Sequence, residues 1–305
     1  MATIRLAWDT TTNKYLLHKG LDNLFDNTLR EAKVEWKRYL NDEKTDQQFV
    51  DDLRMGGLSG MAAVPEGTPL SIQSPVLGGT KRYTQTAYGT GFRITFQMKR
   101  FEKIKLVKSL TRKLGIVMAE GKDVEVNKIF NYPTTVLTGF DGLHLAEDSH
   151  TGLLGGSTSD NYDNYLNADL SYSALASARY YFETLVDDMG MWMGAVPTDV
   201  MVCPTLQTTA EEIFKSSLVP HELSNTASAL RSLSWKPSVN HRLTATTRWI
   251  VLAKDNPNYD LKVITSMEPE ITTQDATDYT KDSVVLAYQM FCYGFGDPRL
   301  CFVGK

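Results

Sequence analysis

The stretch KRFEKIKLVKSLTRKLGIVMAEGKDVEVNKIFN, from Lys99 to Asn131, decides the fold of this chain. Its apolar residues recur at spacings of three and four, which places them on one stripe of a helix. The stripe consists of Ile104, Val107, Leu110, Leu114, Val117 and Met118, and the remaining surface carries Lys103, Lys105, Lys108, Arg112 and Lys113. If the helical stretch from Val124 to Phe130 continues it, the rod is about 50 Å long, from the rise per residue of an α-helix. Such a rod is longer than a compact core is wide, so we expect part of the helix to pack on something outside its own domain.

Gly115 lies in the middle of this helix, where glycine destabilises by about 1 kcal/mol relative to alanine. A neighbouring backbone packed at this position is one explanation. The basic side of the helix is able to meet phosphates, although salt bridges with the acids of a neighbour are favoured. The alternative interpretation of the whole stretch is a two-domain enzyme with one long core helix.

The chain has 305 residues, of which 42% are hydrophobic, as in an ordinary globular protein. This length indicates two domains, or one domain with large excursions. The formal net charge of −4 provides no overall basic footprint for nucleic acid. No apolar run is long enough to span a bilayer, and the first residues show no signal-peptide pattern. Cys203, Cys292 and Cys301 lie in apolar, strand-like settings, which indicates buried free thiols and folding in the cytoplasm.

An amphipathic helix is predicted from Leu21 to Leu40. Its apolar stripe includes Leu24, Phe25 and Trp36. A helix in this position needs a surface to lie on, which is either the core of its own chain or a neighbouring molecule.

Residues 50–80 are rich in glycine and proline and contain no run that predicts a regular element. Loops of more than about 15 residues are uncommon in compact domains and are usually functional or disordered. The region also carries apolar residues that a free linker lacks, namely Met55, Leu58, Met61, Val64, Leu70, Ile72, Val76 and Leu77. Contact with a partner explains a loop that is also apolar, and a lid over an active site is the alternative.

Alternating apolar residues predict a strand from Phe92 to Phe96, directly before the long helix. A later helix is expected to begin at Asp169 or Ser171 and to stop near Gly190, and another passes through Leu206 and Phe214. Further strands are expected at 197–204, 249–253, 261–266, 283–292 and 300–303. The alternation of helices and strands from 165 to 265 predicts a mixed sheet flanked by helices.

The sequence offers no recognisable catalytic or cofactor motif. Gly89 and Gly91 lack the third glycine of a dinucleotide fingerprint, and His221 lacks the second histidine of a zinc-binding helix. The polar segment DGLHLAEDSH contains Asp141, His144, Glu147, Asp148 and His150. These residue types are able to bind a metal, but their spacing matches no standard site, and a solvated loop is the favoured interpretation. We therefore expect no enzyme activity, no cofactor and no metal site.

The order of these parts resembles a tailed-bacteriophage major capsid protein, and a Mu-like major head subunit in particular. YTQTAYGTGFRITFQMKRFEKIKLV, residues 83–107, is similar to the family's return from an extended loop into a long spine helix. GFDGLHLAEDSHTGLLGGSTSDNYDN, residues 139–164, resembles its D-G-x-x-L-x-x-x-x-H loop, and residues 169–214 resemble the block that follows. The end, residues 268–305, looks like the closing strand pair with G-x-x-D-P-R between the strands.

The resemblance implies an α+β fold, the tailed-phage major capsid fold. Residues 1–45 would form an N-terminal arm, 46–97 an extended β-hairpin loop, 98–135 with 266–296 a peripheral domain, and 136–265 with 297–305 an axial domain. Besides the apolar loop residues, the expected contact residues are Ile104, Val107, Leu110, Leu114 and Gly115 of the spine helix and Leu24, Phe25 and Trp36 of the arm. No long N-terminal scaffolding segment and no cross-linking residue pair are recognised.

By the same resemblance, the chain would assemble into pentamers and hexamers of an icosahedral shell around packaged double-stranded DNA. Implied partners are copies of itself, a separate scaffolding protein or protease, a portal protein and a decoration protein, with DNA contacted non-specifically and no membrane. The implied location is the virion, after assembly in the host bacterial cytoplasm. An encapsulin-like nanocompartment shell is the alternative, followed by an uncharacterised α/β enzyme. We expect deletion of residues 56–79 to abolish shells but not folding, and Gly115→Leu to harm assembly more than folding.

Overall fold

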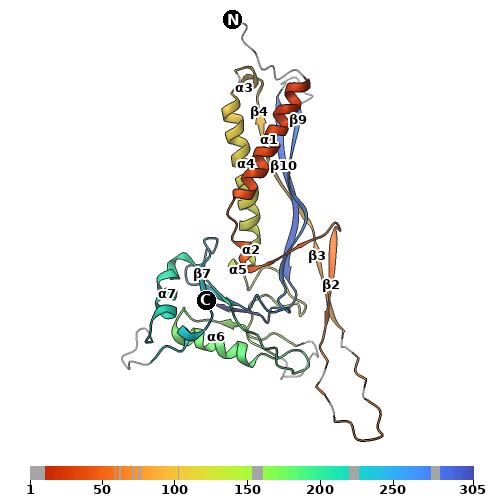
Figure 1. The fold of residues 1–305 in the computed structure, drawn as a ribbon, viewed down its shortest axis with the longest axis vertical. Helices are drawn as coiled ribbons and strands as arrows, with labels where there is room; N and C mark the ends of the chain where they lie inside the picture. Colours follow the sequence, from red (N-terminus) through yellow and green to blue (C-terminus); the bar gives the residue numbers. More distant parts are fainter. Residues whose placement is uncertain are drawn as a thin grey trace.

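The computed structural model describes residues 11–58, 60–61, 63–70, 72–74, 77–101, 103–152, 161–219, 227–275 and 282–305. Its ribbon is elongated and has three parts: an upright helical lobe, a lower lobe that contains the C-terminus, and a projecting hairpin (Figure 1). The arrangement is an α+β fold in which helices and sheets share two main hydrophobic clusters.

The helical lobe is built on a four-stranded sheet with the order β1-β9-β10-β4. Its strands are β1 (Asn41–Lys44), β4 (Thr86–Ile94), β9 (Leu261–Asp275) and β10 (Ser283–Phe295), and its helices are α1 (Thr11–Glu31), α3 (Phe96–Arg100) and α4 (Ile104–Val126). β10 is antiparallel to both β9 and β4, whereas β1 is parallel to β9. Alternate residues of β10, among them Val285 and Ala287, are buried in one cluster with side chains of α1 and α4. The two helices therefore cover one face of this sheet.

The lower lobe is built on a five-stranded sheet with the order β5-β11-β8-β6-β7. Its strands are β5 (Tyr165–Leu166), β6 (Asp199–Val202), β7 (Lys236–Val239), β8 (Trp249–Leu252) and β11 (Cys301–Gly304), and its helices are α6 (Tyr172–Thr184) and α7 (Gln207–Lys215). The sheet is mixed, as predicted, because β6 is parallel to β7 and antiparallel to β8. The Ser171 hydroxyl begins α6 by accepting a hydrogen bond from the N–H of Ala174 at 3.2 Å. The three cysteines are buried free thiols.

The long helix is divided, unlike the prediction. α3 ends at Arg100, α4 begins at Ile104, and α5 (Lys128–Asn131) follows a turn at Asn127. The 23 residues of α4 span about 35 Å, and because α5 is a separate helix, the condition for a rod of about 50 Å is not met.

The predicted apolar stripe of α4 is correct for most of its length. Val107, Leu114 and Met118 are buried, but Val117 is 53% exposed, so its assignment to the stripe is wrong. The buried face continues through Gly115 and Lys122 instead, because these positions are the ones that repeat with the helical period of the buried residues.

The predicted helix from Leu21 to Leu40 is two helices, α1 and the single turn α2 (Trp36–Tyr39). Between them, the backbone N–H groups of Glu35 and Trp36 donate to the carboxylate of Asp123 on α4. A contact with a residue far along the chain therefore decides where α2 begins.

Gly115 allows α1 and α4 to approach closely. A Cβ atom at this position would lie 3.2 Å from Cβ of Thr28 and 3.3 Å from the carbonyl oxygen of Phe25. The neighbouring backbone thus belongs to α1 of the same chain. Because a leucine would push these two helices apart, the structure favours a loss of monomer stability in Gly115→Leu, and its effect on assembly stays a prediction.

The predicted loop over residues 50–80 begins and ends in strands that the sequence pattern did not reveal. β2 (Phe49–Met55) pairs antiparallel with β3 (Leu77–Thr84), with an irregularity after Leu53. β4 also begins before the predicted strand, since it pairs with β10 from Thr86 onward. The range 46–97 therefore includes a complete strand of the helical lobe. None of the helices described is long and apolar enough to cross a bilayer.

Candidate assembly surface

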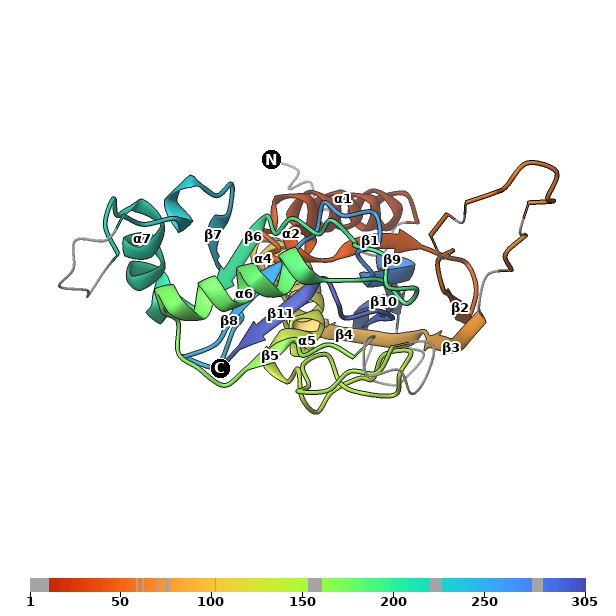
Figure 2. The same ribbon diagram turned by 90° about the horizontal axis from the view of Figure 1, so that it is seen from below.

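The segment between β2 and β3 projects from the body on the side away from α7 (Figures 1 and 2). We call residues 56–76 the extended loop. Its apolar side chains and those of the flanking strand ends, Met55, Leu58, Met61, Val64, Leu70, Ile72 and Leu77, are each exposed by 47% or more. Val76 lies outside the described residues. Soluble monomers rarely expose a contiguous apolar surface, so this segment is well suited to contact another molecule.

Ion pairs hold the hairpin that carries the extended loop. Arg82 on β3 donates through Nε and Nη2 to the two carboxylate oxygens of Asp51 on β2, each at 2.7 Å, and lies over the ring of Phe49. This pair is exposed, so it contributes little to stability. At the next residue of β2, Asp52 accepts from Lys262 of β9, which ties the hairpin to the sheet of the helical lobe.

A buried ionic cluster lies where the hairpin meets the body. Arg54, the penultimate residue of β2, donates through Nη2 and Nε to the two carboxylate oxygens of Asp188 at 2.6 and 3.2 Å. Arg299, between β10 and β11, donates to the same carboxylate. The three side chains are 7%, 6% and 2% exposed. Burial by itself lowers the pKa of Arg299. The electrostatic effects of Asp297, Tyr162 and Asp188 are larger together and raise that pKa above its ordinary value.

The ionic cluster is also where two of the sequence motifs meet. Arg299 closes the G-x-x-D-P-R motif, and its guanidinium carbon lies 5.1 Å from the centroid of the Tyr162 ring. Tyr162 stacks on His150, whose Nδ1 lies 2.6 Å from Oδ2 of Asp141. Asn164 adds a second link, because its side-chain amide donates to the carbonyl of Pro298 at 3.4 Å. The two motifs therefore form one structural unit.

The polar segment around Asp141 has a structural role in this arrangement. Burial raises the pKa of Asp141, but the hydrogen bond and charge of His150, with the N–H of Leu143, outweigh it and lower that pKa below its ordinary value. His144 is held separately, by a 2.8 Å contact between its Nδ1 and the carbonyl of Leu137. Asp141 and His150 are buried, so the solvated-loop interpretation is wrong for these two. Among the described residues, no three His, Cys, Asp or Glu side chains are placed to hold a metal ion.

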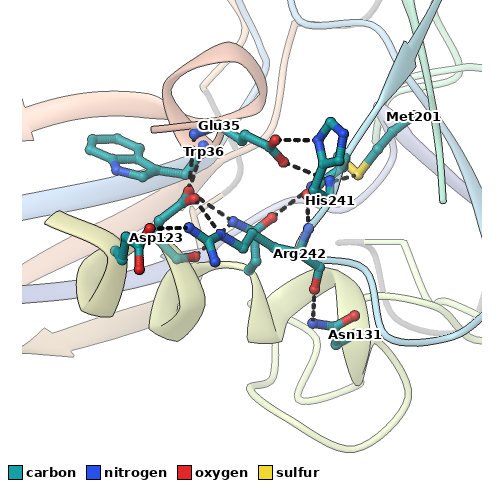
Figure 3. Close-up of polar contacts among 10 residues, drawn as sticks. Glu35, Trp36, Asp123, Asn131, Met201, His241 and Arg242 are labelled. Atoms are coloured by element: carbon teal, nitrogen blue, oxygen red, sulfur yellow. Dashed lines mark hydrogen bonds and ion pairs between the residues drawn. The ribbon is translucent and has the colours of Figure 1, made fainter. Parts of the chain in front are cut away.

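Asp123 joins the two lobes (Figure 3). Its carboxylate accepts from the backbone N–H groups of Glu35 and Trp36 at 3.1 and 3.0 Å and from Nε of Arg242 at 2.9 Å. Asp123 lies on α4, whereas Arg242 follows β7 in the lower lobe. The carboxylate is fully buried, and such a group is tolerated only when charged and hydrogen-bonding partners surround it. The three segments are therefore held in one geometry.

Further polar contacts surround Asp123 (Figure 3). Asn131 donates from Nδ2 to the carbonyl of Arg242 at 2.9 Å. His241 meets Glu35 twice, through its backbone N–H at 2.7 Å and its ring Nδ1 at 2.6 Å. These contacts fix the orientation of the helical lobe on the lower lobe, and hence the relative orientation of the surfaces that each lobe presents.

The outer face of α4 is basic, as predicted. Lys103, Lys105, Lys108, Arg112 and Lys113 are exposed, and within the part of the chain that the structure describes they form no ion pair. Below them, Val117 and Val124 line an open groove of about 500 Å³ together with Tyr88 of β4 and Gln289 of β10. The apolar pattern of the sequence does not predict this groove, because it places Val117 on the buried stripe.

The other predicted contact residues lie inside the chain. Phe25 and Trp36 of the arm and Val107, Leu114 and Gly115 of α4 are buried, and Leu24, Ile104 and Leu110 are half-buried. The buried residues pack the core of this chain, whereas Leu24, Ile104 and Leu110 keep part of their surface accessible, and their contact with a neighbour stays a prediction.

Arg54, Asp188 and Arg299 were missed by the sequence reasoning. An arginine in a strand and an aspartate after a helix are ordinarily solvent-exposed, so pattern alone does not reveal their burial. The D-P-R tripeptide within the motif was the available signal for Arg299.

Comparison with known proteins gives a family and a fold. The family model described as "Phage capsid protein" matches residues 78–303. Among solved structures, the virus-like particle from Pyrococcus furiosus is 10% identical with a TM-score of 0.55, and covers 94% of this chain and 98% of that one. The capsid of Cyanophage P-SCSP1u is 9% identical with a TM-score of 0.58, and covers 90% and 88%. The capsid of an empty GTA particle is 10% identical with a TM-score of 0.57, and covers 89% of each chain. No curated protein sequence matches the chain.

Proposed function

This chain belongs to the phage capsid protein family, and on that premise we propose that it is a major head subunit forming an icosahedral shell of pentamers and hexamers around packaged double-stranded DNA. That it is a capsid shell protein of phage type follows from the family and agrees with the capsid fold of its structural neighbours. The rings, the DNA and the icosahedral order are the proposal.

The extended loop is the observation that carries this proposal. The described part of the loop and the adjoining strand ends present seven apolar side chains to solvent, on a hairpin that projects from the body, and a neighbouring copy would cover them. In a ring, one surface of each subunit meets a different surface of the next, and such head-to-tail contacts close on themselves. A single contact of millimolar affinity contributes about 4 kcal/mol. Several contacts made together are far stronger, because each later contact forms at high effective concentration.

The charge of the chain supports the proposal that DNA is contacted non-specifically. The formal net charge is −4, and exposed cations gather on one helix face. An interior with strong basic lining would bind phosphates with salt-dependent affinity and hinder DNA movement. A separate scaffolding protein or protease, a portal protein and a decoration protein complete the proposed set of partners, with assembly in the host bacterial cytoplasm.

A nanocompartment shell that holds an enzyme cargo is the second candidate. The observation in its favour is the fold shared with the virus-like particle from Pyrococcus furiosus over nearly the whole of both chains. Purified particles distinguish the two candidates by their contents: DNA and a portal protein indicate a phage head, whereas an enzyme cargo indicates a compartment.

The test of the assembly role compares two sets of changes within the extended loop. Met61→Ser, Leu70→Ser and Ile72→Ser together should leave a folded, soluble subunit that forms no shells in electron micrographs. The matched control, Glu66→Gln with Ser74→Thr, changes polar residues of the same loop and should assemble as the unchanged chain does. Intact shells from the triple serine variant would refute the assigned role of the loop.

A further inference from the structure

We propose that the buried cluster of Arg54, Asp188 and Arg299 is a clamp that sets the direction of the extended loop and thereby the size of the shell. Arg54 is the residue before Met55, with which β2 ends and the loop begins. Asp188 and Arg299 belong to the body, between α6 and β6 and between β10 and β11. The clamp therefore binds the hairpin at the end of β2, where the extended loop begins.

The geometry of the clamp allows little freedom. Arg54 meets both carboxylate oxygens of Asp188, and a two-point contact of this kind fixes orientation as well as distance. Arg299, which lies 111 residues after Asp188 in the chain, donates to the same carboxylate. All three charges are buried, so a swing of the hairpin would leave charged groups without partners in a poorly hydrated site.

The first residues of the extended loop are held against the same part of the body. A Cβ atom on Gly57 would lie 2.7 Å from Oδ2 of Asp187, so glycine permits a close approach there. Oδ1 of Asp187 in turn accepts from the N–H groups of Met189 and Met191, each at 2.9 Å, which stabilises the turn that the loop rests on. Arg54 and Gly57 thus both contact the body where the loop leaves the hairpin, two residues beyond the tie between Asp52 and Lys262.

The clamp is anchored deep in the lower part of the molecule. Arg299 contacts Tyr162, Tyr162 stacks on His150, and His150 bonds to Asp141. By contrast, the Arg82–Asp51 pair lies on the same hairpin but is exposed and joins only β3 to β2. It cannot orient the hairpin on the body, which makes it a matched control.

The first measurement is made on the soluble subunit. Labels on cysteines introduced at Glu66, in the extended loop, and at Ala176, on α6, report the distribution of distances between loop and body. The three native cysteines are buried and stay unlabelled in the folded chain. We expect Asp188→Asn and Arg54→Gln each to broaden this distribution at least twofold, whereas Asp51→Asn leaves it unchanged. Arg54→Gln is included because its polar side chain keeps the site filled should Asp188→Asn prevent folding.

The second measurement is made on assembled shells, and this part rests on the proposed function. We expect the clamp variants to produce shells of varied diameter in cryo-electron microscopy, and the Asp51→Asn control to produce shells as uniform as those of the unchanged chain. An unchanged distance distribution in both clamp variants would overturn the clamp. Shells of uniform diameter despite a broadened distribution would overturn its effect on shell size. If the unchanged chain forms no shells, the proposed function fails while the distance measurement still tests the clamp.

Discussion

At the scale of single residues, buried charges do most of the orienting in this protein. The carboxylate of Asp123 is fully buried, yet it has donors from the arm, from Asn127 at the end of its own helix and from the lower lobe. A buried ion is stable only while its partners remain, so removal of one member is far more damaging than the loss of an exposed ion pair.

Asp123→Ala is expected to destabilise the subunit by about 3–5 kcal/mol, because Arg242 and two backbone N–H groups lose their acceptor. Denaturant unfolding of the soluble chain measures this difference. Glu120→Ala is the control, since Glu120 is half-exposed and lies 3.6 Å from the same arginine; its effect should be about 1 kcal/mol or less. Similar losses for the two variants would contradict the role assigned to Asp123.

Asp141 makes the stability of the subunit depend on pH. Its pKa is lowered in the folded chain from the ordinary value of 3.8, so it contributes stability that is fully present above that pH and is lost as the pH falls through the folded value. Asp141→Asn should therefore lower the free energy of unfolding at pH 6. The difference in this free energy between the variant and the unchanged chain should become smaller below about pH 4. Chemical denaturation at a series of pH values measures the gap, and a gap that widens on acidification would contradict the prediction.

At the scale of elements, the periodic patterns of the sequence carry most of the structure. The helix stripe through Val107, Leu114 and Met118 and the buried strand at Trp249–Leu252 follow directly from the spacing of apolar residues. β2 does not, because its alternation is inverted: Phe49, Leu53 and Met55 are exposed, whereas Asp52 and Arg54 lie on the side that faces the body. The break between α1 and α2 also escapes a pattern, since Asp123 creates it from a distance.

The packing of α1 on α4 is expected to depend on Gly115. Gly115→Leu should destabilise the monomer by about 1–3 kcal/mol through overpacking against Thr28 and Phe25. Gly121→Ala is the control on the same helix, because a Cβ there meets nothing within 4 Å; it should stabilise by about 0.4–1 kcal/mol. Thermal melts of the two variants measure both effects, and equal melting temperatures would show that α1 does not press on Gly115.

At the scale of the whole molecule, charge is distributed unevenly. The chain is acidic overall, yet α4 presents on its outer face a row of cations that form no ion pair with any residue the structure describes. In a shell these cations have two possible counterparts, the acids of a neighbouring copy and the phosphates of DNA. The acids of a neighbouring copy are the favoured counterpart, and the effect of salt on assembly distinguishes the two.

Lys105→Gln, Lys108→Gln and Arg112→Gln together should raise the concentration needed for assembly and reduce its dependence on salt, because fewer ion pairs form between copies. Light scattering at several salt concentrations measures both quantities. Arg179→Gln with Lys215→Gln serves as the control, since each of these cations already pairs with a glutamate of its own helix. Unchanged assembly at every salt concentration would exclude the neighbour and leave DNA phosphates as the counterpart.

By itself, the sequence determined the elements with strong periodicity, the apolar character of the extended loop and the resemblance that led to the family. These features depend on residues close together in the chain, whose spacing reports directly on burial. Only the tertiary structure decided what Gly115 packs against, where the long helix is interrupted, and that Arg54, Asp188 and Arg299 share one buried site. Those outcomes depend on contacts between residues that are distant in sequence, and the free energy of burying a charge is set by the partners that folding brings to it.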